Sequence, residues 1–303
     1  MNILVSGGSG FIGGALVARL RAAGHRVAIL TRRADSTDPD TIAWDPATGR
    51  LDAAALEGFG AVVHLAGESI GAGRLTAARK RAIMDSRTGG TRLLATTLAA
   101  LRARPTVLVS ASGINFYGSR GDEALRESAP AGAGFLAEVC RAWEAATAPA
   151  AAAGIRVVVL RTGMVLAADG GALARMLPLF SAGGGGVLGP GTQWWSWITR
   201  EDQVAVIEHV IADQAVSGAV NAVSPGAVTN REFTRALGAA LHRPTVLPAP
   251  AFALRLALGE LADELLLAST RVEPAVLTAR GFRFADPTLA GALRRLLAPG
   301  GAA

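Results

Sequence analysis

Apolar residues recur along the first two-thirds of the chain in a pattern that predicts strands alternating with helices. Short apolar runs, each the length of a strand, occupy residues 3–5, 26–31, 61–66, 106–110, 155–160 and 218–223. Between these runs, apolar positions recur at helical spacing over residues 11–24, 74–101, 135–148 and 204–211. Strands that alternate with helices predict a parallel sheet with crossover helices, and the continuous β-branched run 157–159 suits a strand buried on both faces. The pattern therefore predicts an α/β protein with a doubly wound parallel sheet of the Rossmann type.

The pattern changes after residue 247. Two prolines, at 248 and 250, precede an amphipathic segment at 252–267, and a final helical pattern covers 289–297. We predict a large domain over 1–247 and a small, mostly helical C-terminal subdomain over 248–299. Within the large domain, the glycines of 183–186 and 189–191 predict a mobile loop, which belongs to a substrate-side segment at 169–200.

The composition indicates a globular protein without a nucleic-acid partner. Half of the 303 residues are hydrophobic and 18% are charged, so a large core can form. The formal net charge is +6, but the basic residues are dispersed, and no basic stripe is interleaved with aromatic residues. We expect a small-molecule substrate as the partner, and we leave the oligomeric state open between monomer and homodimer.

Cysteine usage and the start of the chain indicate a cytoplasmic protein. Cys140 is the only cysteine, so neither an intramolecular disulfide nor a cysteine metal cluster can form, and no metal site is predicted. The first strand starts at residue 2 or 3, which leaves no space for a signal peptide, and no apolar run approaches the roughly 20 residues of a membrane span. We therefore expect no membrane partner.

The first apolar run leads directly into a glycine-rich turn with Gly7, Gly10 and Gly13, and a helical pattern follows. This order of strand, turn and helix suits a dinucleotide pyrophosphate. The first glycine permits the tight turn, the second lets the backbone approach phosphate, and the third lets the helix pack close to the sheet. The helix start then offers unpaired N–H groups to the negative charge. We predict a nicotinamide dinucleotide site here.

The residues after the second strand indicate which dinucleotide binds. NAD sites place an acid there for the ribose 2′-hydroxyl, whereas NADP sites place an arginine for the 2′-phosphate. This chain has Thr31, Arg32 and Arg33, with no acid before Asp35. We predict NADP(H) as the cofactor, with NAD(H) as the less favoured alternative.

The glycine spacing, together with the Gly-Phe-Ile-Gly sequence at 10–13, resembles the extended branch of the short-chain dehydrogenase/reductase superfamily. Further motifs along nearly the whole chain resemble one epimerase-like family within that branch. They include Trp44-Asp-Pro, Asp85-Ser-Arg87, Arg161-Thr-Gly163, Gln193-Trp-Trp-Ser-Trp-Ile198 and Asn230-Arg-Glu-Phe233. That family combines an NAD-dependent epimerase/dehydratase domain with a C-terminal domain of unknown function. Its members are sometimes labelled nucleoside-diphosphate sugar epimerase or cell-division inhibitor. The chain departs from it at Thr199, where the family pattern has a histidine.

The resemblance implies a set of site residues. It places Phe11, Ile12, Leu65, Ala66, Gly67, Ser110, Arg161 and Thr162 at the cofactor, beside the glycines and Thr31, Arg32 and Arg33. It places Tyr117, Arg87, Trp194, Trp195 and Trp197 at the substrate cleft. For the three tryptophans, packing in the core is the alternative to an aromatic wall. His64 falls at the end of a strand, where a structural role is the favoured interpretation.

The motif that normally transfers the proton is missing. Enzymes of this branch use Tyr-x-x-x-Lys on the helix that here covers 135–148. Aligned on Glu144, the two positions hold Leu136 and Cys140; aligned one residue earlier, they hold Phe135 and Val139. The segment Ser110-Ala-Ser112-Gly-Ile-Asn-Phe-Tyr117-Gly resembles the Ser-Ser-x-x-x-Tyr-Gly motif of the same branch. Tyr117, the only tyrosine, matches the structural tyrosine of that motif.

Three other residues are the candidates for catalysis, namely Ser112, Ser110 and Glu68. The serine position of the family motif falls on either Ser112 or Gly113. The leading interpretation is an NADP(H)-binding, epimerase-like oxidoreductase of unidentified substrate. The alternative is a non-catalytic NADP(H)-binding sensor or regulator, for example of cell division.

Overall fold

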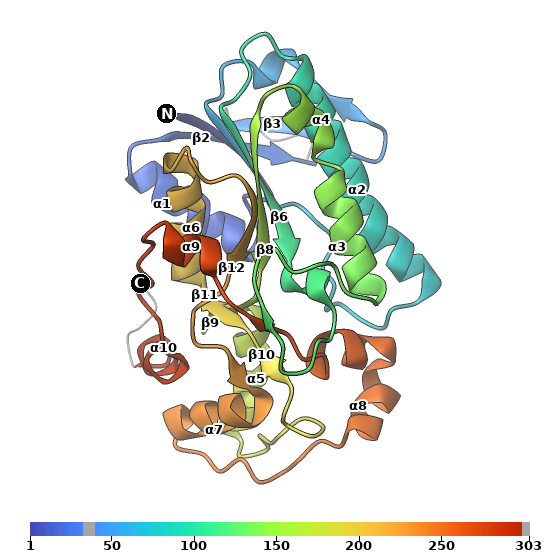
Figure 1. The fold of residues 1–303 in the computed structure, drawn as a ribbon, viewed down its shortest axis with the longest axis vertical. Helices are drawn as coiled ribbons and strands as arrows, with labels where there is room; N and C mark the ends of the chain where they lie inside the picture. The colour runs from blue at the N-terminus through green and yellow to red at the C-terminus, as the bar shows by residue number, and fades with distance from the viewer. Residues whose placement is uncertain (33–39, 299–303) are drawn as a thin grey trace.

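A single eight-stranded sheet organises the protein, as the computed structural model of residues 1–32 and 40–298 shows (Figure 1). The strands lie in the order β12-β8-β6-β5-β1-β2-β3-β4, and all are parallel except β4, which runs antiparallel to β3. Their bounds are β1 Asn2–Ser6, β2 Arg26–Thr31, β3 Thr41–Asp45, β4 Arg50–Leu51, β5 Ala61–His64, β6 Val107–Gly113, β8 Arg156–Thr162 and β12 Gly218–Ala222. The predicted doubly wound parallel sheet is confirmed. The direction of winding reverses beside β1, which is where such sheets bind ligands.

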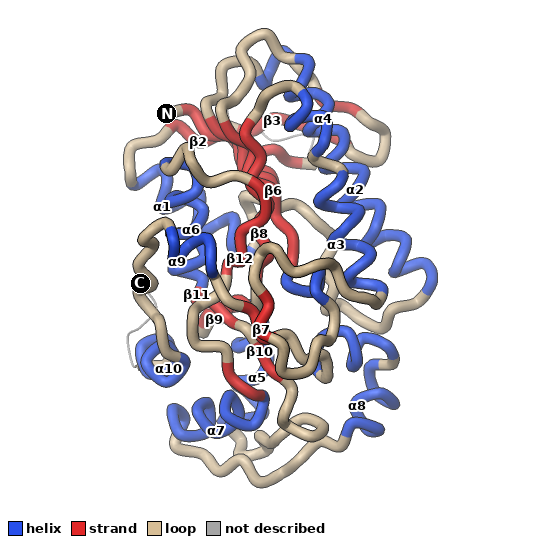
Figure 2. Tube along the Cα trace, in the orientation of Figure 1, coloured by secondary structure: helices blue, strands red, loops and turns tan. Residues whose placement is uncertain are grey.

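Helices cover both faces of this sheet, as Figure 2 shows. One face carries α1 (Phe11–Ala22), α6 (Arg200–Ala212) and α9 (Ala275–Ala279), and the other carries α2 (Ala77–Ala100), α3 (Phe135–Ala145) and α4 (Ala148–Ala152). Alternate residues of β1 pack on opposite faces of the sheet, since Ile3 and Val5 belong to one buried cluster and Leu4 belongs to the other. The strands therefore have cores on both sides, as their continuous apolar runs predicted.

Two helix starts are fixed by threonine caps. Thr76 accepts a hydrogen bond from the Arg79 amide at 3.2 Å, so α2 begins at Ala77, three residues after the predicted start. Thr199 caps α6 in the same way by accepting from the Asp202 amide at 3.3 Å. A helix cap is thus the role of the threonine that stands where the family pattern has a histidine.

Below the sheet, α5 and α7 pack with short strand pairs into a second layer (Figure 1). The helices are α5 Gly171–Ser181, α7 Asn230–Leu241, α8 Ala251–Leu258 and α10 Leu289–Leu296. The short strands are β7 Ala124–Leu125, β9 Met164–Ala167, β10 Trp194–Trp195, β11 Trp197–Thr199, β13 Val228–Thr229 and β14 Arg271–Val272. Single turns of other helix types cover Ala54–Leu56, Ile114–Tyr117 and Ala262–Leu266.

The C-terminal region is mostly helical, as predicted, and its elements pack against three separate parts of the chain. The strand β14 pairs with β7, α9 packs against β12, and α10 packs against α7. The amphipathic segment 252–267 forms two helical pieces and not one, because Gly259 ends α8 with a left-handed φ of 62°. The domain boundary at residue 247 stays a prediction. Within the described residues, no helix combines the length and apolar character that crossing a bilayer requires.

Candidate functional site

Three cavities lie in series where the parallel strands β1, β2, β6 and β8 end. The first, of about 1160 Å³, lies beyond β2, and we call it the β2 cavity. The central cavity, of about 350 Å³, lies at the ends of β1, β6 and β8, and it shares Gly7 with the β2 cavity. The apolar cavity, of about 610 Å³, shares Asn115 and Thr162 with the central cavity. The three cavities therefore lie next to one another along the strand ends, which leaves room for an elongated ligand and a second, smaller one.

The glycine turn after β1 forms the junction of the first two cavities. Gly7 has a left-handed φ of 72°, and a Cβ at Gly13 would lie 2.1 Å from the Gly7 carbonyl oxygen. A Cβ at Gly10 would meet only that oxygen, at 3.2 Å, because Gly10 otherwise faces the central cavity. The fold thus requires glycine at positions 7 and 13, whereas Gly10 keeps the central cavity open.

The start of α1 is prepared for an anion. Its N-cap residue, Gly10, supplies no side-chain cap, and the first turn of the helix contains no acid. Phe11, Ile12 and Gly13 of that turn line the central cavity. Since the first N–H groups of a helix have no intrahelical acceptor and the helix dipole is positive there, this turn favours a phosphate.

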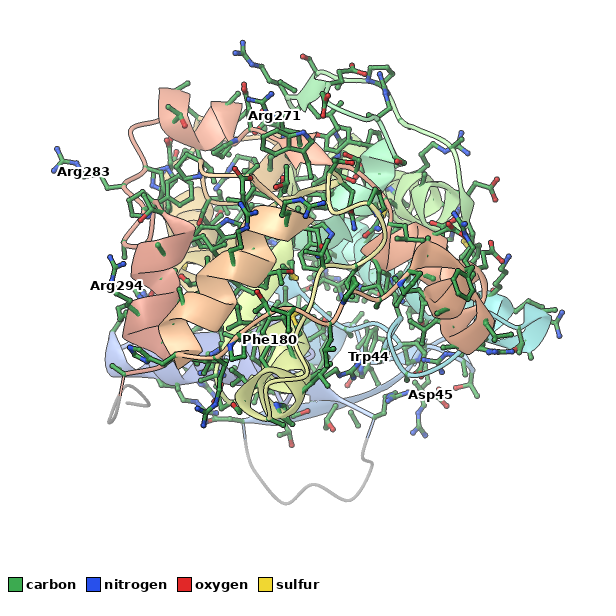
Figure 3. All side chains as sticks on the ribbon, turned by 90° about the horizontal axis from the view of Figure 1, so that it is seen from below. Trp44, Asp45, Phe180, Arg271, Arg283 and Arg294 are labelled. Atoms are coloured by element: carbon green, nitrogen blue, oxygen red, sulfur yellow. The ribbon has the colours of Figure 1, made fainter. Side chains whose placement is uncertain are left out.

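The β2 cavity has a basic edge and an aromatic edge. Thr31 and Arg32 line one side of it, and Trp44 and Asp45, at the end of β3, line another. In Figure 3, Trp44 and Asp45 lie together and apart from Phe180, which lines the apolar cavity at the other end of the series. Ala66 and Gly67 complete the side nearest the glycine turn, while Leu65 lines the central cavity. Arg33 lies outside the described residues.

The carboxylate of Asp45 is occupied by its own turn. It accepts hydrogen bonds from the Ala47 amide at 3.0 Å and from the Thr48 hydroxyl at 2.8 Å. The bond from Thr48 lowers the pKa of Asp45, so this group is an anion at the rim of the cavity. It is an acid that the sequence pattern did not indicate, because it follows the third strand and not the second.

His64 is structural. Its ring is fully buried between the hydroxyl of Ser6, at 2.6 Å, and that of Thr91, at 2.9 Å. Burial lowers the pKa of His64 to about 4, so the ring is neutral at physiological pH. The ring therefore ties β1, β5 and α2 together.

Residues of α3 form one wall of the central cavity. Leu136, Val139, Cys140 and Trp143 line it, whereas Phe135 does not. The alignment on Glu144 is therefore the one that brings both positions of the missing pair to the cavity. Burial raises the pKa of the Cys140 thiol to about 11. A leucine and a protonated thiol thus stand where the family pattern has a phenol and an ammonium group.

A chain of hydrogen bonds runs from the cavity into the core through Ser112. The Ser112 hydroxyl lines the central cavity and donates to Glu144 Oε1 at 2.8 Å. Glu144 is held by Arg161 through two bonds of 2.9 Å each. Arg161 also donates to the hydroxyl of Tyr117 at 3.0 Å, and that hydroxyl donates to Asn221 at 2.7 Å.

This chain places two predicted site residues behind the cavity wall. Arg161 and Tyr117 are buried, and neither is among the residues that line the three cavities. The guanidinium of Arg161 is 3.4 Å from the ring centroid of Phe116, which closes its other side. These two residues therefore support the position of Ser112, whereas Thr162 lines the central cavity itself.

The other catalytic candidates are placed away from the cavity. The side chain of Ser110 is buried in β6, and the carboxylate of Glu68 pairs with Arg79 at 3.1 Å. Neither residue lines any of the three cavities, so Ser112 is the one candidate hydroxyl that the structure brings there. Arg87 also lines the central cavity, with its guanidinium 4.9 Å from the Trp143 ring.

Of the three neighbouring tryptophans, two line a cavity and one packs in the core. Trp194 and Trp195 line the apolar cavity. Trp197 is fully buried, and its indole nitrogen donates to the Gly226 carbonyl at 2.8 Å, so it belongs to the core and not to the predicted cleft.

Sequence reasoning missed several residues of the site. Asn115, Gln203, Phe180 and Asn230 line the central or the apolar cavity, and they come from four separate elements. Asn115 and Asn230 do lie in segments whose motifs resemble the family. Nothing in the local sequence around Gln203 or Phe180 points to a cavity.

Comparisons with known proteins agree with this architecture. The model of the NAD dependent epimerase/dehydratase family matches residues 3–222, and that of a domain of unknown function, DUF1731, matches residues 249–296. An epimerase family protein of Mycobacterium bovis is 44% identical over 291 residues, which cover 96% of each chain.

Two solved structures with more than 30% identity have the same fold. A crystal structure of the human epimerase family protein SDR39U1 (isoform 2) with NADPH gives a TM-score of 0.88 at 32% identity, over 98% of this chain and 99% of that chain. A nucleoside-diphosphate sugar epimerase from Corynebacterium glutamicum gives a TM-score of 0.82 at 37% identity, over 98% of this chain and 58% of the other. The resemblance expected from the motifs is confirmed, and the chain belongs to the NAD dependent epimerase/dehydratase family.

Proposed function

We propose that the protein is an NADP(H)-dependent oxidoreductase that acts on a small carbonyl compound or on the corresponding alcohol. The observation that carries this proposal is the series of three adjacent cavities along the strand ends, with the uncapped start of α1 at its centre. A dinucleotide spans the β2 cavity and the central cavity, and the substrate occupies the apolar cavity beside it. The NADPH in the human relative's structure supports the choice of cofactor.

The residues that line these cavities fit this cofactor. The turn at Gly10–Gly13 offers its amides to the pyrophosphate, and Arg32 offers a cation to the 2′-phosphate. Gln203 adds a second polar contact in the central cavity, because its Oε1 is buried there and has no hydrogen-bond partner among the described residues. A buried, unpaired acceptor costs free energy unless a ligand satisfies it, and a carboxamide N–H of the nicotinamide would do so.

NADPH bound in these cavities would supply the hydride that reduces a carbonyl carbon, and water would supply the proton to the carbonyl oxygen, which would give an alcohol and NADP⁺. The protein's own contribution is to position the reactants. The hydroxyl of Ser112 donates its proton to Glu144, so its oxygen can accept a hydrogen bond from the O–H of the alcohol and orient that group. Because Leu136 and Cys140 replace the usual proton-transfer pair, turnover is expected to be slow.

The same replacement favours a second candidate function, that of an NADP(H)-binding sensor or regulator without turnover. Such a protein keeps the cofactor site and needs no proton relay. The volume of the apolar cavity, about 610 Å³, favours the enzyme, since a sensor of the cofactor alone has no use for it.

One experiment separates these functions. NADPH is first titrated into the protein by calorimetry, and the absorbance of NADPH is then followed in the presence of a panel of carbonyl compounds. The enzyme predicts both binding and oxidation of NADPH by at least one compound. The sensor predicts binding without oxidation, and absence of binding would contradict both.

A further inference from the structure

We propose that the apolar cavity binds a neutral, largely hydrophobic carbonyl compound, and not a sugar attached to a nucleoside diphosphate. This inference rests on the proposed function, because it names the substrate class for the same site. It is carried by the chemistry of the cavity wall, by one unpaired buried donor and by the exposed rim of the cavity.

Most of the wall is apolar. The apolar cavity has a volume of about 610 Å³, which lies within the range of about 300–1,000 Å³ typical of pockets for drug-sized ligands. The apolar side chains come from five parts of the chain, which are β9, α5, β10, α7 and the segment after α8. They include Met164, Met176, Phe180, Trp194, Trp195, Phe233, Leu265 and Leu266. A wall of this kind favours a ligand that buries hydrocarbon.

The charges at this cavity do not suit a diphosphate. Among the described residues, its lining contains one cation, Arg175, and one anion, Glu264. Arg175 is exposed, and its Nη1 already donates to the Gly71 carbonyl at 3.0 Å. Glu264 accepts from the amides of Phe135 and Leu136, at 2.8 and 3.2 Å, which fixes a carboxylate at the start of α3. A diphosphate carries two negative charges. In this cavity it would meet one cation, Arg175, which already binds a carbonyl, and one anion, Glu264, which would repel it.

Asn230 offers a polar group to a ligand oxygen. Asn230 lines the cavity and is 1% exposed. Its Oδ1 accepts from the Leu188 amide at 2.8 Å, which fixes the orientation of the side-chain amide. Its Nδ2 is buried and has no hydrogen-bond partner among the described residues. A buried, unpaired donor in an apolar wall is expected to bind a neutral oxygen acceptor, such as a carbonyl, an ether or a hydroxyl.

The apolar lining continues to the surface. Leu179 and Leu247 both line the cavity and are also 57% and 59% exposed, so they form an apolar rim. Helix α8, whose last residue Leu258 lines the cavity, has no buried residue and exposes Phe252 and Leu256. An apolar rim that leads into an apolar cavity favours a lipophilic ligand over a hydrophilic one.

The experiment uses a neutral fluorescent probe with saturating NADP⁺ present. N-phenyl-1-naphthylamine, which brightens in apolar surroundings, is titrated into the full-length protein, and 2-undecanone and UDP-glucose are then tested as competitors. We expect saturable binding of one probe molecule per chain. We expect 2-undecanone to displace the probe, and UDP-glucose at millimolar concentration not to displace it. Displacement by UDP-glucose, or absence of saturable probe binding, would overturn the proposal.

Matched variants assign the binding to this cavity. Leu247→Glu places a carboxylate on the rim, and Val246→Glu places the same charge on the adjacent residue, which is 72% exposed and does not line the cavity. We expect the first to weaken probe binding about tenfold and the second to leave it within about twofold. Equal effects of the two variants would overturn the proposal, because the probe would then bind the outer surface.

Two further variants keep the test independent of a folding defect. Leu179→Glu places the charge on another exposed residue of the rim, in α5. It replaces Leu247→Glu if circular dichroism shows that Leu247→Glu is unfolded. Asn230→Asp keeps the oxygen that accepts from Leu188 and removes the donor, at the start of α7, where an acid is tolerated. We expect it to weaken displacement by 2-undecanone about tenfold. The same titration without NADP⁺ reports on the cavity even if the proposed cofactor fails to bind, so the two proposals fail separately.

Discussion

The hydroxyl of Ser112 donates a hydrogen bond of 2.8 Å to Glu144, a carboxylate that two bonds to Arg161 hold in place. Ser112 lies in the wall of the central cavity, and Arg161 lies behind it. Because the hydroxyl proton is donated to Glu144, the arrangement leaves the lone pairs of the Ser112 oxygen for the central cavity. A buried ion pair thus positions the one candidate catalytic hydroxyl, although the proton-transfer pair of the family is missing.

The first prediction concerns this hydroxyl. Ser112→Ala removes it and leaves the Glu144–Arg161 pair intact, so the protein should stay folded while the rate of NADPH oxidation falls about tenfold or more. Ser110→Ala changes a serine two residues earlier in β6 that lines none of the three cavities, so this variant should keep the wild-type rate. The rates are measured at saturating NADPH with the most reactive compound of the carbonyl panel. Identical rates for both variants and wild type would rule out a role for Ser112.

The second prediction separates stability from binding at Tyr117. Tyr117→Phe deletes the hydroxyl that joins Arg161 to Asn221, at 3.0 and 2.7 Å. The buried Oδ1 of Asn221 then loses its donor, whereas Arg161 keeps its bonds to Glu144 and to the Glu127 carbonyl. The free energy of unfolding should fall by about 1–3 kcal/mol, while the affinity for NADPH stays within about twofold. Urea denaturation gives the first quantity and calorimetry the second. A large loss of NADPH affinity in a stably folded variant would place Tyr117 at the site.

The third prediction is a pH dependence that comes from His64. Burial lowers the pKa of this ring to about 4 in the folded protein, whereas the unfolded chain has a pKa of about 6.5. Between these values the unfolded state binds more protons than the folded state, so the free energy of unfolding falls as the pH falls from about 6.5 to about 4. The contribution is on the order of 3 kcal/mol at its full extent.

Denaturation of wild type and His64→Gln across this range of pH checks the assignment. The glutamine side chain keeps polar groups between Ser6 and Thr91 and does not titrate. The variant should start from a lower stability near neutral pH and lose less of it on acidification. If both proteins lose the same free energy as the pH falls, the dependence does not come from His64.

The central strands and the glycine turn could be predicted because their signals are local. Each of the six predicted strands is an apolar run flanked by turn residues, and each is found in the sheet as β1, β2, β5, β6, β8 or β12. The strand β3 gave no such signal, because it lies near the edge of the sheet and only Trp44 of its five residues is buried. A strand with one buried side chain does not produce an apolar run.

The polar contacts of the site could not be predicted, because they join residues that are far apart along the chain. Tyr117 and Asn221 are 104 residues apart, and Glu264 accepts from Phe135 across 129 residues. No sequence spacing encodes such pairs. For the same reason, the sequence alone did not show that Trp195 lines a cavity while Trp197, two residues later, lies in the core.

The fourth prediction concerns the glycine turn. Gly10→Val should abolish NADPH binding and leave a folded protein, because Gly10 lines the central cavity and a Cβ added there meets only one backbone atom, at 3.2 Å. Gly14→Ala on the same helix is the control, since its Cβ would have an ordinary contact of 3.8 Å. The control should bind NADPH normally and gain up to about 1 kcal/mol of stability. Normal NADPH affinity in folded Gly10→Val would show that the phosphates bind elsewhere.

Calorimetric titration of NADPH and NADH into wild type and Arg32→Ala tests the account most directly. In the function that we propose, NADP(H) occupies the β2 cavity and the central cavity, with Arg32 at the 2′-phosphate. We expect one NADPH per chain, bound at least about tenfold more tightly than NADH, and a loss of most of this preference in Arg32→Ala. Equal affinities of wild type for the two cofactors, or an unchanged preference in the variant, would contradict the account.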